Sequence, residues 1–475
     1  MARAARAAVV ITLAAMGVAA AGGCASFPAT FCEYGFCTEG ADAATDAGGG
    51  TVPPGCDTPT EPAKNAEKCF VDSFGAYVSP AGKDTNPGTR AAPFKTIAKA
   101  LTSGKPRVVV CEGEYNESVE LTSTVEVYGK VACTFDRGGG ATKVKGAKPD
   151  YAVRVFRTAN VRLADLEIEA APGVASAPGS YGVVIADSTG VSLVRLRVDA
   201  KDGAAGADGV LAPYTFPEPV PASIPGRGES GACPGGATSQ GGQGGATDLA
   251  SGGDGLPRPS AGTSGKGAGA NCGSLAQTGA DGATGPNGGS ALKVGEVTGA
   301  GWQGTSGSPG APGFPGGGGG GGGYTTGDPS AIGGGGAAGG CGGAGGGGGG
   351  AGGSSIALVM YASDVTLDTC ALRAGAPGAG GAGATTSQEG QPGSAALTTG
   401  AACTGAAGGR GGPGGLGGGG AGGSSVGLAW TGTEPKFIGT TTVVRAETGA
   451  PAPGGAGASG AVGVKGVNVD VLKAP

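Results

Sequence analysis

Four segments of this chain can be set beneath one another, and their similarity limits the fold more than any other feature. Segments beginning at Tyr151 and Tyr181 align without a gap, one beginning at Ile356 is a residue shorter, and one beginning at Val426 fits more loosely. Each has short stretches of alternating apolar residues and ends in an Ala/Gly-rich turn. One such unit cannot bury its inner face alone, so we expect the units to stack as parallel coils.

A second pattern precedes the repeats. A short strand near Tyr77 is followed by a turn rich in Gly, Asp, Asn and Pro. In the next segment, Phe94, Ile97 and Leu101 fall on one face of an expected helix. Asp84 and Asn86 are interpreted as turn residues that hydrogen-bond the backbone, with Ca²⁺ binding as the weaker alternative.

This stretch resembles the N-terminal signature of a family of secreted bacterial pectin-lyase-like proteins of unknown function. The matching residues are Val78, Ser79, Gly82, Asp84, Pro87, Gly88, Thr89, Pro93, Phe94, Thr96, Ile97, Ala100 and Leu101. The resemblance implies an all-β fold, a single-stranded right-handed parallel β-helix whose first coil is capped by a short helix. Independently, Cys111 and Cys133 are 22 residues apart, about one coil, and stacked coils lie within disulfide reach, so we predict that they are bonded.

Two glycine-rich insertions, 203–354 and 375–424, interrupt the repeats where a terminal turn is expected. Within them Gly recurs at every third residue, for example from Gly301 to Gly322, which would place Gly along one edge of a polyproline-II-type helix. Two interpretations remain open: the runs pack side by side as a bundle, or they are mobile loops. Pairing of Cys233 with Cys272 and of Cys341 with Cys403 would favour the bundle, and Cys370 is the candidate for an unpaired buried thiol.

The first residues indicate export. Arg3 and Arg6 precede an apolar run that ends at Gly22-Gly23-Cys24, which resembles the lipobox of bacterial lipoproteins. The resemblance implies lipidation of Cys24 and anchoring to the bacterial outer membrane or cell surface; the alternative is ordinary cleavage after Ala21. The high cysteine count agrees with an oxidising compartment, and Cys32 with Cys37 and Cys56 with Cys69 are candidate braces of small loops.

These features divide the chain into seven parts. The expected order is a signal peptide (1–23), a tether (24–74), N-terminal coils (75–202), an insertion (203–354), a coil (355–374), a second insertion (375–424) and C-terminal coils (425–475).

The composition excludes several kinds of chemistry. The chain has no His, so it lacks Ser-His-Asp and Cys-His catalysis and any zinc site with His ligands. Its net charge of -5, without a basic cluster, argues against nucleic-acid binding. We expect no metal and no cofactor.

A glycosidase would need two carboxylates across a cleft. The candidates are Asp165, Glu167, Asp187, Asp199, Asp364 and Asp368, and proximity of Asp187, Asp364 and Asp368 beside a groove would favour an enzyme. Trp302 is the candidate for stacking on a sugar ring, whereas Trp430 is expected in the core. The sequence therefore predicts a surface lipoprotein that is structural, adhesive or carbohydrate-binding without catalysis; the alternative is a polysaccharide lyase or glycoside hydrolase. A cell-surface polysaccharide is the expected partner besides the membrane.

Overall fold

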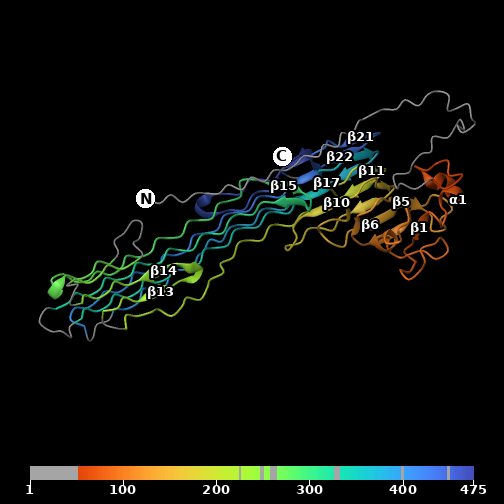
Figure 1. Ribbon diagram of the computed structural model, residues 1–475. Helices are drawn as coiled ribbons and strands as arrows, with labels where there is room; N and C mark the ends of the chain where they lie inside the picture. Colours follow the sequence, from red (N-terminus) through yellow and green to blue (C-terminus); the bar gives the residue numbers. More distant parts are fainter. Residues whose placement is uncertain are drawn as a thin grey trace, which may run out of the picture. The chain divides into compact units, whose positions relative to one another are not determined.

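The computed structural model describes residues 52–223, 226–246, 251–256, 265–325, 332–396, 401–446 and 450–474. Three parallel sheets dominate this part of the chain (Figure 1). Sheet A comprises β1 (Gly75–Val78), β2 (Arg107–Cys111), β5 (Glu126–Val131), β8 (Arg162–Ala164), β11 (Val191–Val194), β18 (Val365–Asp368) and β21 (Lys436–Ile438). Sheet B comprises β3 (Gly113–Asn116), β6 (Thr142–Lys145), β9 (Glu167–Glu169), β12 (Arg197–Asp199), β19 (Ala371–Arg373) and β22 (Thr442–Val444). Sheet C comprises β4 (Val119–Leu121), β7 (Val153–Phe156), β10 (Ser180–Ala186), β17 (Ser355–Tyr361), β20 (Ser425–Thr431) and β23 (Asn468–Lys473).

From β2 onward the strands of the three sheets follow one another along the chain in the order A, B, C, and each new strand adds beside its predecessor in the same sheet. Tyr181 pairs with Ile356, and Ile356 pairs with Val426, so the repeats detected in the sequence are neighbours in sheet C. In sheet A, Leu193 lies between Leu163 and Leu367 in register. The leucine ladder of sheet A points inward and is part of one buried core, and the register of both sheets confirms the predicted parallel stacking.

The first coil is capped as the sequence pattern predicts. Helix α2 (Ile97–Leu101) is capped by Thr96, whose side chain accepts a hydrogen bond from the Lys99 N–H. Ile97 and Ala100 are buried against the core. The Glu117 carboxylate accepts hydrogen bonds from the Ile97 and Ala98 N–H groups, and its burial raises the pKa of Glu117. The cap therefore closes the core at the β1 end of the sheets.

Asp84 and Asn86 stabilise this cap. Both Asp84 oxygens accept hydrogen bonds: Oδ1 from the Lys95 and Thr96 N–H groups, at 2.9 Å each, and Oδ2 from the Thr96 hydroxyl at 3.0 Å. Asn86 donates to the Pro93 carbonyl at 2.8 Å. The turn interpretation of these two residues is therefore correct.

The Asp84 contacts predict a pH dependence. Burial tends to raise the pKa of Asp84, but the hydrogen bonds from Thr96 and Lys95 outweigh it and lower the pKa below its ordinary value. A carboxylate whose pKa is lower in the folded state stabilises the fold at neutral pH and loses this contribution as the pH falls through the acidic range. Asp84→Asn should be less stable to unfolding than wild type at pH 7, and the two proteins should be equally stable near pH 2. Thermal unfolding across pH measures this, and a difference that persists in acid would contradict it.

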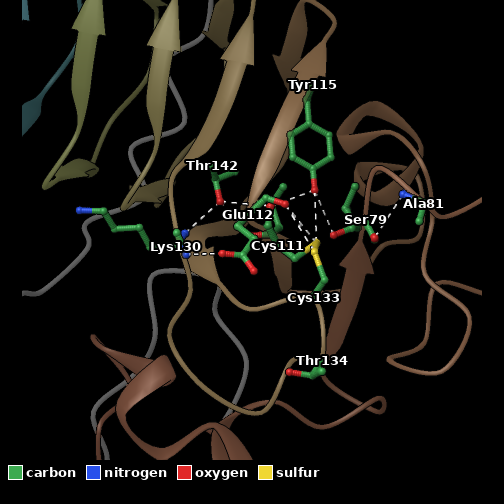
Figure 2. The surroundings of a disulfide bond; sticks show 12 residues. Ser79, Ala81, Cys111, Glu112, Tyr115, Lys130, Cys133, Thr134 and Thr142 are labelled. Atoms are coloured by element: carbon green, nitrogen blue, oxygen red, sulfur yellow. Dashed lines mark hydrogen bonds between the residues drawn. A yellow bond between two sulfur atoms is a disulfide. The ribbon is translucent and has the colours of Figure 1, made fainter.

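The predicted disulfide between Cys111 and Cys133 is present, with a Cα–Cα distance of 4.9 Å (Figure 2). Tyr115 donates its hydroxyl proton to the Cys111 carbonyl at 3.0 Å, and the Thr142 hydroxyl donates to the same oxygen at 3.2 Å. The bond thus joins β2 to the segment that follows β5, in a well-bonded part of the first two coils.

Part of the expected tether is folded. Cys56 is bonded to Cys69 around the short helices η2 (Pro62–Asn65) and α1 (Ala66–Cys69). Ala66 and Phe70 pack with Tyr77, Val109 and Phe135 on sheet A. The candidate brace Cys56–Cys69 within the span 24–74 is therefore present, and the loop that it closes has its own apolar face. Cys24, Cys32 and Cys37 lie outside the described residues.

The glycine-rich insertions form a bundle of extended runs that lie side by side (Figure 1). We number the main runs 1 (203–223), 2 (273–292), 3 (305–325), 4 (332–353), 5 (375–396) and 6 (401–423). Hydrogen bonds recur at every third residue: the N–H groups of Gly340, Gly343 and Gly346 donate to the carbonyls of Gly409, Gly412 and Gly415, at 2.9 Å each. Of the two interpretations left open, the packed bundle is the one found.

Close approach of the runs explains the glycine. A Cβ atom at Gly343 would lie 1.8 Å from the Gln388 carbonyl oxygen, and one at Gly412 would lie 2.0 Å from that of Ala283. Run 4 bonds to runs 1, 3, 5 and 6 and consists almost entirely of Gly and Ala after Ile332. Run 1 bonds mainly to runs 4 and 5, and its last glycine is Gly209. The number of neighbours of a run thus sets how many of its residues must be glycine.

The bundle corrects two predictions. Cys233 is bonded to Cys341, and Cys272 to Cys403, so the pairings Cys233–Cys272 and Cys341–Cys403 are wrong. Cys370 is a buried free thiol, as expected. A third, shorter glycine-rich excursion (450–466) separates β22 from β23 within the span assigned to C-terminal coils. All three excursions connect a strand of sheet B to the next strand of sheet C.

Smaller elements complete the described structure. They are β13 (Ser230–Ala232), η3 (Pro234–Gly236), β14 (Thr238–Gln240), η4 (Ala270–Cys272), β15 (Gly295–Thr298), β16 (Gly301–Gly304) and η5 (Ala458–Gly460). The β15–β16 hairpin joins run 2 to run 3 and lies against sheet C.

Candidate functional site

The three carboxylates singled out for catalysis each have a local partner. Asp187 lies 3.7 Å from the Arg157 guanidinium, and Asp364 lies 3.3 Å from the Lys436 ammonium group. Asp368 accepts a hydrogen bond from its neighbour's hydroxyl at 2.9 Å. None of the three lines either hollow described below. Two of the three carboxylates are thus paired with a cation and the third accepts a hydrogen bond from a neutral hydroxyl.

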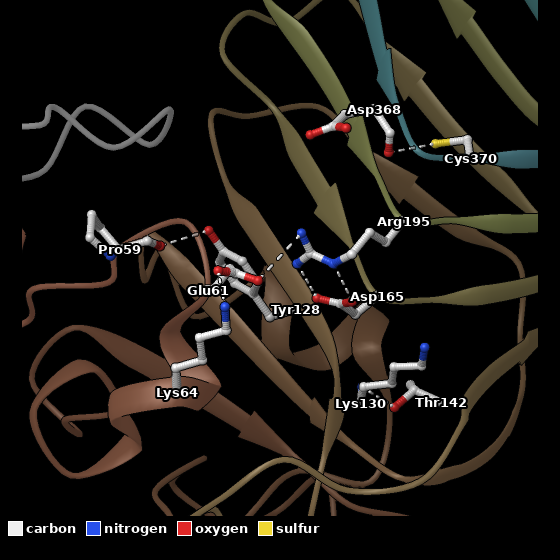
Figure 3. A network of polar contacts seen from close by, with 10 residues as sticks. All are labelled: Pro59, Glu61, Lys64, Tyr128, Lys130, Thr142, Asp165, Arg195, Asp368 and Cys370. Carbon is white, nitrogen blue, oxygen red and sulfur yellow. Dashed lines mark hydrogen bonds and ion pairs between the residues drawn. The ribbon is translucent and has the colours of Figure 1, made fainter. Parts of the chain in front are cut away.

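Two of the other acidic candidates, Asp165 and Asp199, also have a partner, while Glu167 lies in β9 of sheet B, away from both hollows. Arg195 makes a bidentate contact with Asp165, at 2.8 and 2.6 Å, between two adjacent coils (Figure 3). This contact raises the pKa of Arg195. Arg197 pairs with Asp199 on the outer face of sheet B at 2.8 Å. Such pairs neutralise the carboxylates.

A small hollow of about 160 Å³ lies beside the Arg195–Asp165 pair. Glu61, from the disulfide-closed loop, reaches within 4.0 Å of Arg195 and pairs with Lys64 at 2.5 Å (Figure 3). The Tyr128 hydroxyl donates to the Pro59 carbonyl at 3.1 Å. Because these contacts join the loop to the coils, we interpret the cluster as an attachment of the N-terminal loop rather than as a reaction centre.

A larger groove forms where the bundle meets sheet C. The outer face of this sheet has an apolar stripe that includes Val184, Ile356 and Val359. The β15–β16 hairpin covers the stripe with Val297 and Trp302. Trp302 is only 6% exposed, so it packs as part of this second core and shows little surface for stacking. Beside the hairpin, a groove of about 690 Å³ remains open.

We call this hollow the tyrosine groove. Its lining comes from sheet C, the segments before β7 and β10, the hairpin and runs 1, 3 and 4; the residues are Asp150, Tyr151, Arg154, Ala175, Ala177, Pro178, Gly179, Tyr181, Ala207, Ala300, Trp302, Gln303, Gly304, Ser306, Gly350, Ala351, Gly352, Gly353 and Ser354. Its volume is in the range of small-molecule sites, and a mainly apolar wall with a few polar groups is typical of them.

Polar contacts position the aromatic side chains of the groove. The Tyr181 hydroxyl donates to the Trp302 carbonyl at 3.1 Å, which ties the hairpin to β10. The Arg154 guanidinium donates to the Gly299 carbonyl at 3.1 Å and lies 5.9 Å from the centre of the Tyr151 ring. Glu120 is 3.7 Å from the same guanidinium. Arg154 thus connects β7, the hairpin tip and Tyr151.

The groove offers the Tyr151 phenol as a neutral donor and Arg154 as a cation, whereas the Tyr181 hydroxyl already donates to Trp302. Burial raises the pKa of Tyr151 and of Tyr181. Asp150 provides a carboxylate opposite Arg154 in charge. This combination of two phenol rings, small apolar residues and a few polar groups suits a flat, hydroxyl-rich ligand.

The sequence indicates only part of this site. It singles out Trp302, but it marks Tyr151 and Tyr181 only as the first residues of repeats. Tyr181 and Trp302 are 121 residues apart in the chain, and nothing local shows that they meet. Trp430, expected in the core, is buried there.

The described chain is therefore a mainly β protein of stacked parallel strands. Residues 80–151, which run from the turn before α2 to Tyr151 of the tyrosine groove, match the model of a family described as a protein of unknown function (DUF1565). No curated protein and no solved structure matches the chain. The match covers the cap and the first coils. It overlaps the signature residues between Val78 and Leu101 that were identified in the sequence.

Four disulfides join described residues, which favours an exported protein because such bonds persist in oxidising compartments. In the part of the chain that the structure describes, every helix is too short or too polar to cross a bilayer.

Proposed function

We propose that this protein is an exported surface protein that binds an extracellular polysaccharide in the tyrosine groove without cleaving it. The observation behind the proposal is the groove itself, where Tyr151, Tyr181 and Arg154 line an open space of about 690 Å³. Carbohydrate rings present apolar C–H faces to phenol rings and hydroxyls to the surrounding polar groups. The bundle supports this role because runs 1 and 4 supply one wall.

The proposal includes a finer view of the fold and of its attachment. The three sheets would close into a right-handed parallel β-helix of the pectin-lyase-like kind, supported by the rotation of the chain through sheets A, B and C and by the match over residues 80–151. Lipidation at Cys24 would attach the chain to the bacterial outer membrane or cell surface, supported by the lipobox-like sequence.

A polysaccharide lyase or hydrolase is the alternative function. It is disfavoured because Asp187, Asp364 and Asp368 each contact a local partner and none lines the tyrosine groove. Asp150 is the single carboxylate that lines this groove, whereas glycoside hydrolysis normally uses two.

A glycan array followed by affinity measurements on the purified protein tests the proposal. We expect binding to at least one polysaccharide, and Tyr151→Ala should weaken that binding about tenfold, the loss expected when one anchoring contact is removed. Tyr151→Phe, which keeps the ring, should retain most of the affinity.

Arg197→Ala is the matched control, because Arg197 is a surface arginine on sheet B that is remote from the groove lining. Its affinity should equal that of wild type. Absence of binding to every glycan, or equal losses in Tyr151→Ala and Arg197→Ala, would argue against the groove. Release of oligosaccharides from a bound polymer would replace the non-catalytic proposal with the enzymatic one.

A further inference from the structure

The parallel pairs of runs in the bundle share a reciprocal contact. In runs 2 and 6, the Gly282 N–H donates to the Arg410 carbonyl at 2.7 Å, and the Arg410 N–H donates back to Oδ1 of Asp281 at 2.8 Å. Asn287 repeats the arrangement: the N–H of the glycine after it donates to the Leu416 carbonyl at 2.8 Å, and the Leu416 N–H donates to Asn287 Oδ1 at 2.9 Å. We call such a side chain a clip.

The clips occur at constant spacing. Asp281, Asn287 and Ser290 each accept from an N–H that lies 129 residues further along the chain. Between the parallel runs 1 and 5, Asp202, which directly precedes run 1, and Asp208 each accept from an N–H of run 5 that lies 174 residues further on. Fixed separations of this kind mean that each pair of runs is held in one alignment along its length.

One position of run 2, the residue before Gly285, lacks a clip. The Gly285 N–H donates to the Pro413 carbonyl at 2.9 Å, in line with the other rungs. Proline has no N–H to return, and the residue before Gly285 is Thr284, for which no hydrogen bond to run 6 is found. Clips thus stand opposite residues that can donate.

The glycine ladder by itself does not define this alignment. A three-residue slide of one run past another restores the same pattern of glycines and backbone hydrogen bonds, and glycine-rich strands specify register weakly. A slide of run 6 by three residues, however, brings Pro413 opposite Asp281 or Asn287. That clip then loses its donor.

We infer that the clip side chains select the register in which the two insertions assemble, and that the backbone ladder alone leaves several registers nearly equal in energy. This role is independent of the proposed ligand. It explains why acceptor side chains recur at fixed places along these glycine-rich runs.

The Cys272–Cys403 disulfide reports on this register because it joins the segment before run 2 to run 6. A slide of three residues displaces a run by about 9 Å. Disulfide formation tolerates Cα separations up to about 7 Å. A slipped assembly therefore cannot form the Cys272–Cys403 bond without distortion.

The test is oxidative refolding of the fully reduced protein, followed by peptide mapping without reduction. The yield of Cys272–Cys403 is divided by the yield of Cys111–Cys133, which forms in the coils and serves as an internal standard. For the variant with Asp281→Ala and Asn287→Ala, we expect this ratio to fall about fivefold, as two hydrogen bonds that favour one register are lost.

Two controls make the result specific. Thr284→Ala changes an exposed residue of the same run that is not a clip, and it should leave the ratio at the wild-type value. The exchange variant with Asp281→Asn and Asn287→Asp keeps an acceptor oxygen at both positions and should restore most of it. A double-alanine variant with a wild-type ratio would overturn the inference. So would equal losses of both disulfides, or an exchange variant as poor as the double-alanine variant.

Discussion

Replacing Gly288 with alanine should loosen the contact between runs 2 and 3 by about 2–3 kcal/mol, the scale of overpacking in a close-packed interior. A Cβ atom at this position would lie 2.0 Å from the Ser308 carbonyl oxygen, so the two runs must separate. Hydrogen exchange at the Ser308 and Ala311 amides, which donate to run 2, measures the change directly. We expect both amides to exchange markedly faster than in wild type.

The adjacent residue provides the control. A Cβ atom at Gly289 would meet nothing within 4 Å, and its backbone conformation is one that other residues adopt freely. Gly289→Ala should therefore be neutral or slightly stabilising, because alanine restricts the unfolded chain. If the two variants exchanged alike, the glycines would be needed for some reason other than the close approach of the runs.

Arg107→Ala should destabilise the first coils by about 3–5 kcal/mol, the usual effect of breaking a buried ion pair. The Arg107 side chain is 0% exposed and lies 2.8 Å from Glu126, which is 2% exposed. It also donates to the Cys69 carbonyl at 3.2 Å and lies 5.2 Å from the centre of the Tyr128 ring. Alanine would leave the Glu126 charge buried beneath the disulfide-closed loop. Thermal unfolding followed by circular dichroism measures the loss.

Two comparisons isolate the buried charge as the cause. Arg197→Ala removes an arginine whose side chain is 58% exposed, and the expected loss is below about 1 kcal/mol. Combining Arg107→Met with Glu126→Gln removes both charges and should recover much of the stability lost in Arg107→Ala. A double variant no more stable than Arg107→Ala would show that packing, rather than the unpaired charge, dominates.

The sequence predicts the coils well because their signal is local. Alternating apolar residues recur at one length, so Tyr181, Ile356 and Val426 align in the sequence in the same way as they pair in sheet C. The Cys111–Cys133 bond follows from the same length. The cap is also local, since Asp84 and Thr96 lie within one short segment.

The bundle and the groove cannot be predicted in the same way. A three-residue glycine period fits both packed and unpacked runs, and only the neighbours of a run decide between them. The pairing of Cys233 with Cys341 depends on which runs are adjacent, which is a long-range property. Tyr151 and Trp302 likewise become neighbours only when the first insertion returns to sheet C. Glu61 gives no signal in the sequence because the composition around it resembles a linker.

All three excursions lie between a strand of sheet B and the next strand of sheet C, and this shared position determines how the chain can be lengthened. Each excursion starts at the end of a sheet B strand and must come back to start a strand of sheet C. Every added excursion therefore contributes as many runs that lead away from the sheets as runs that return to them. A lengthened or duplicated excursion would thicken or extend the bundle while the core of the coils kept its composition, so the two halves of the molecule can diverge at different rates.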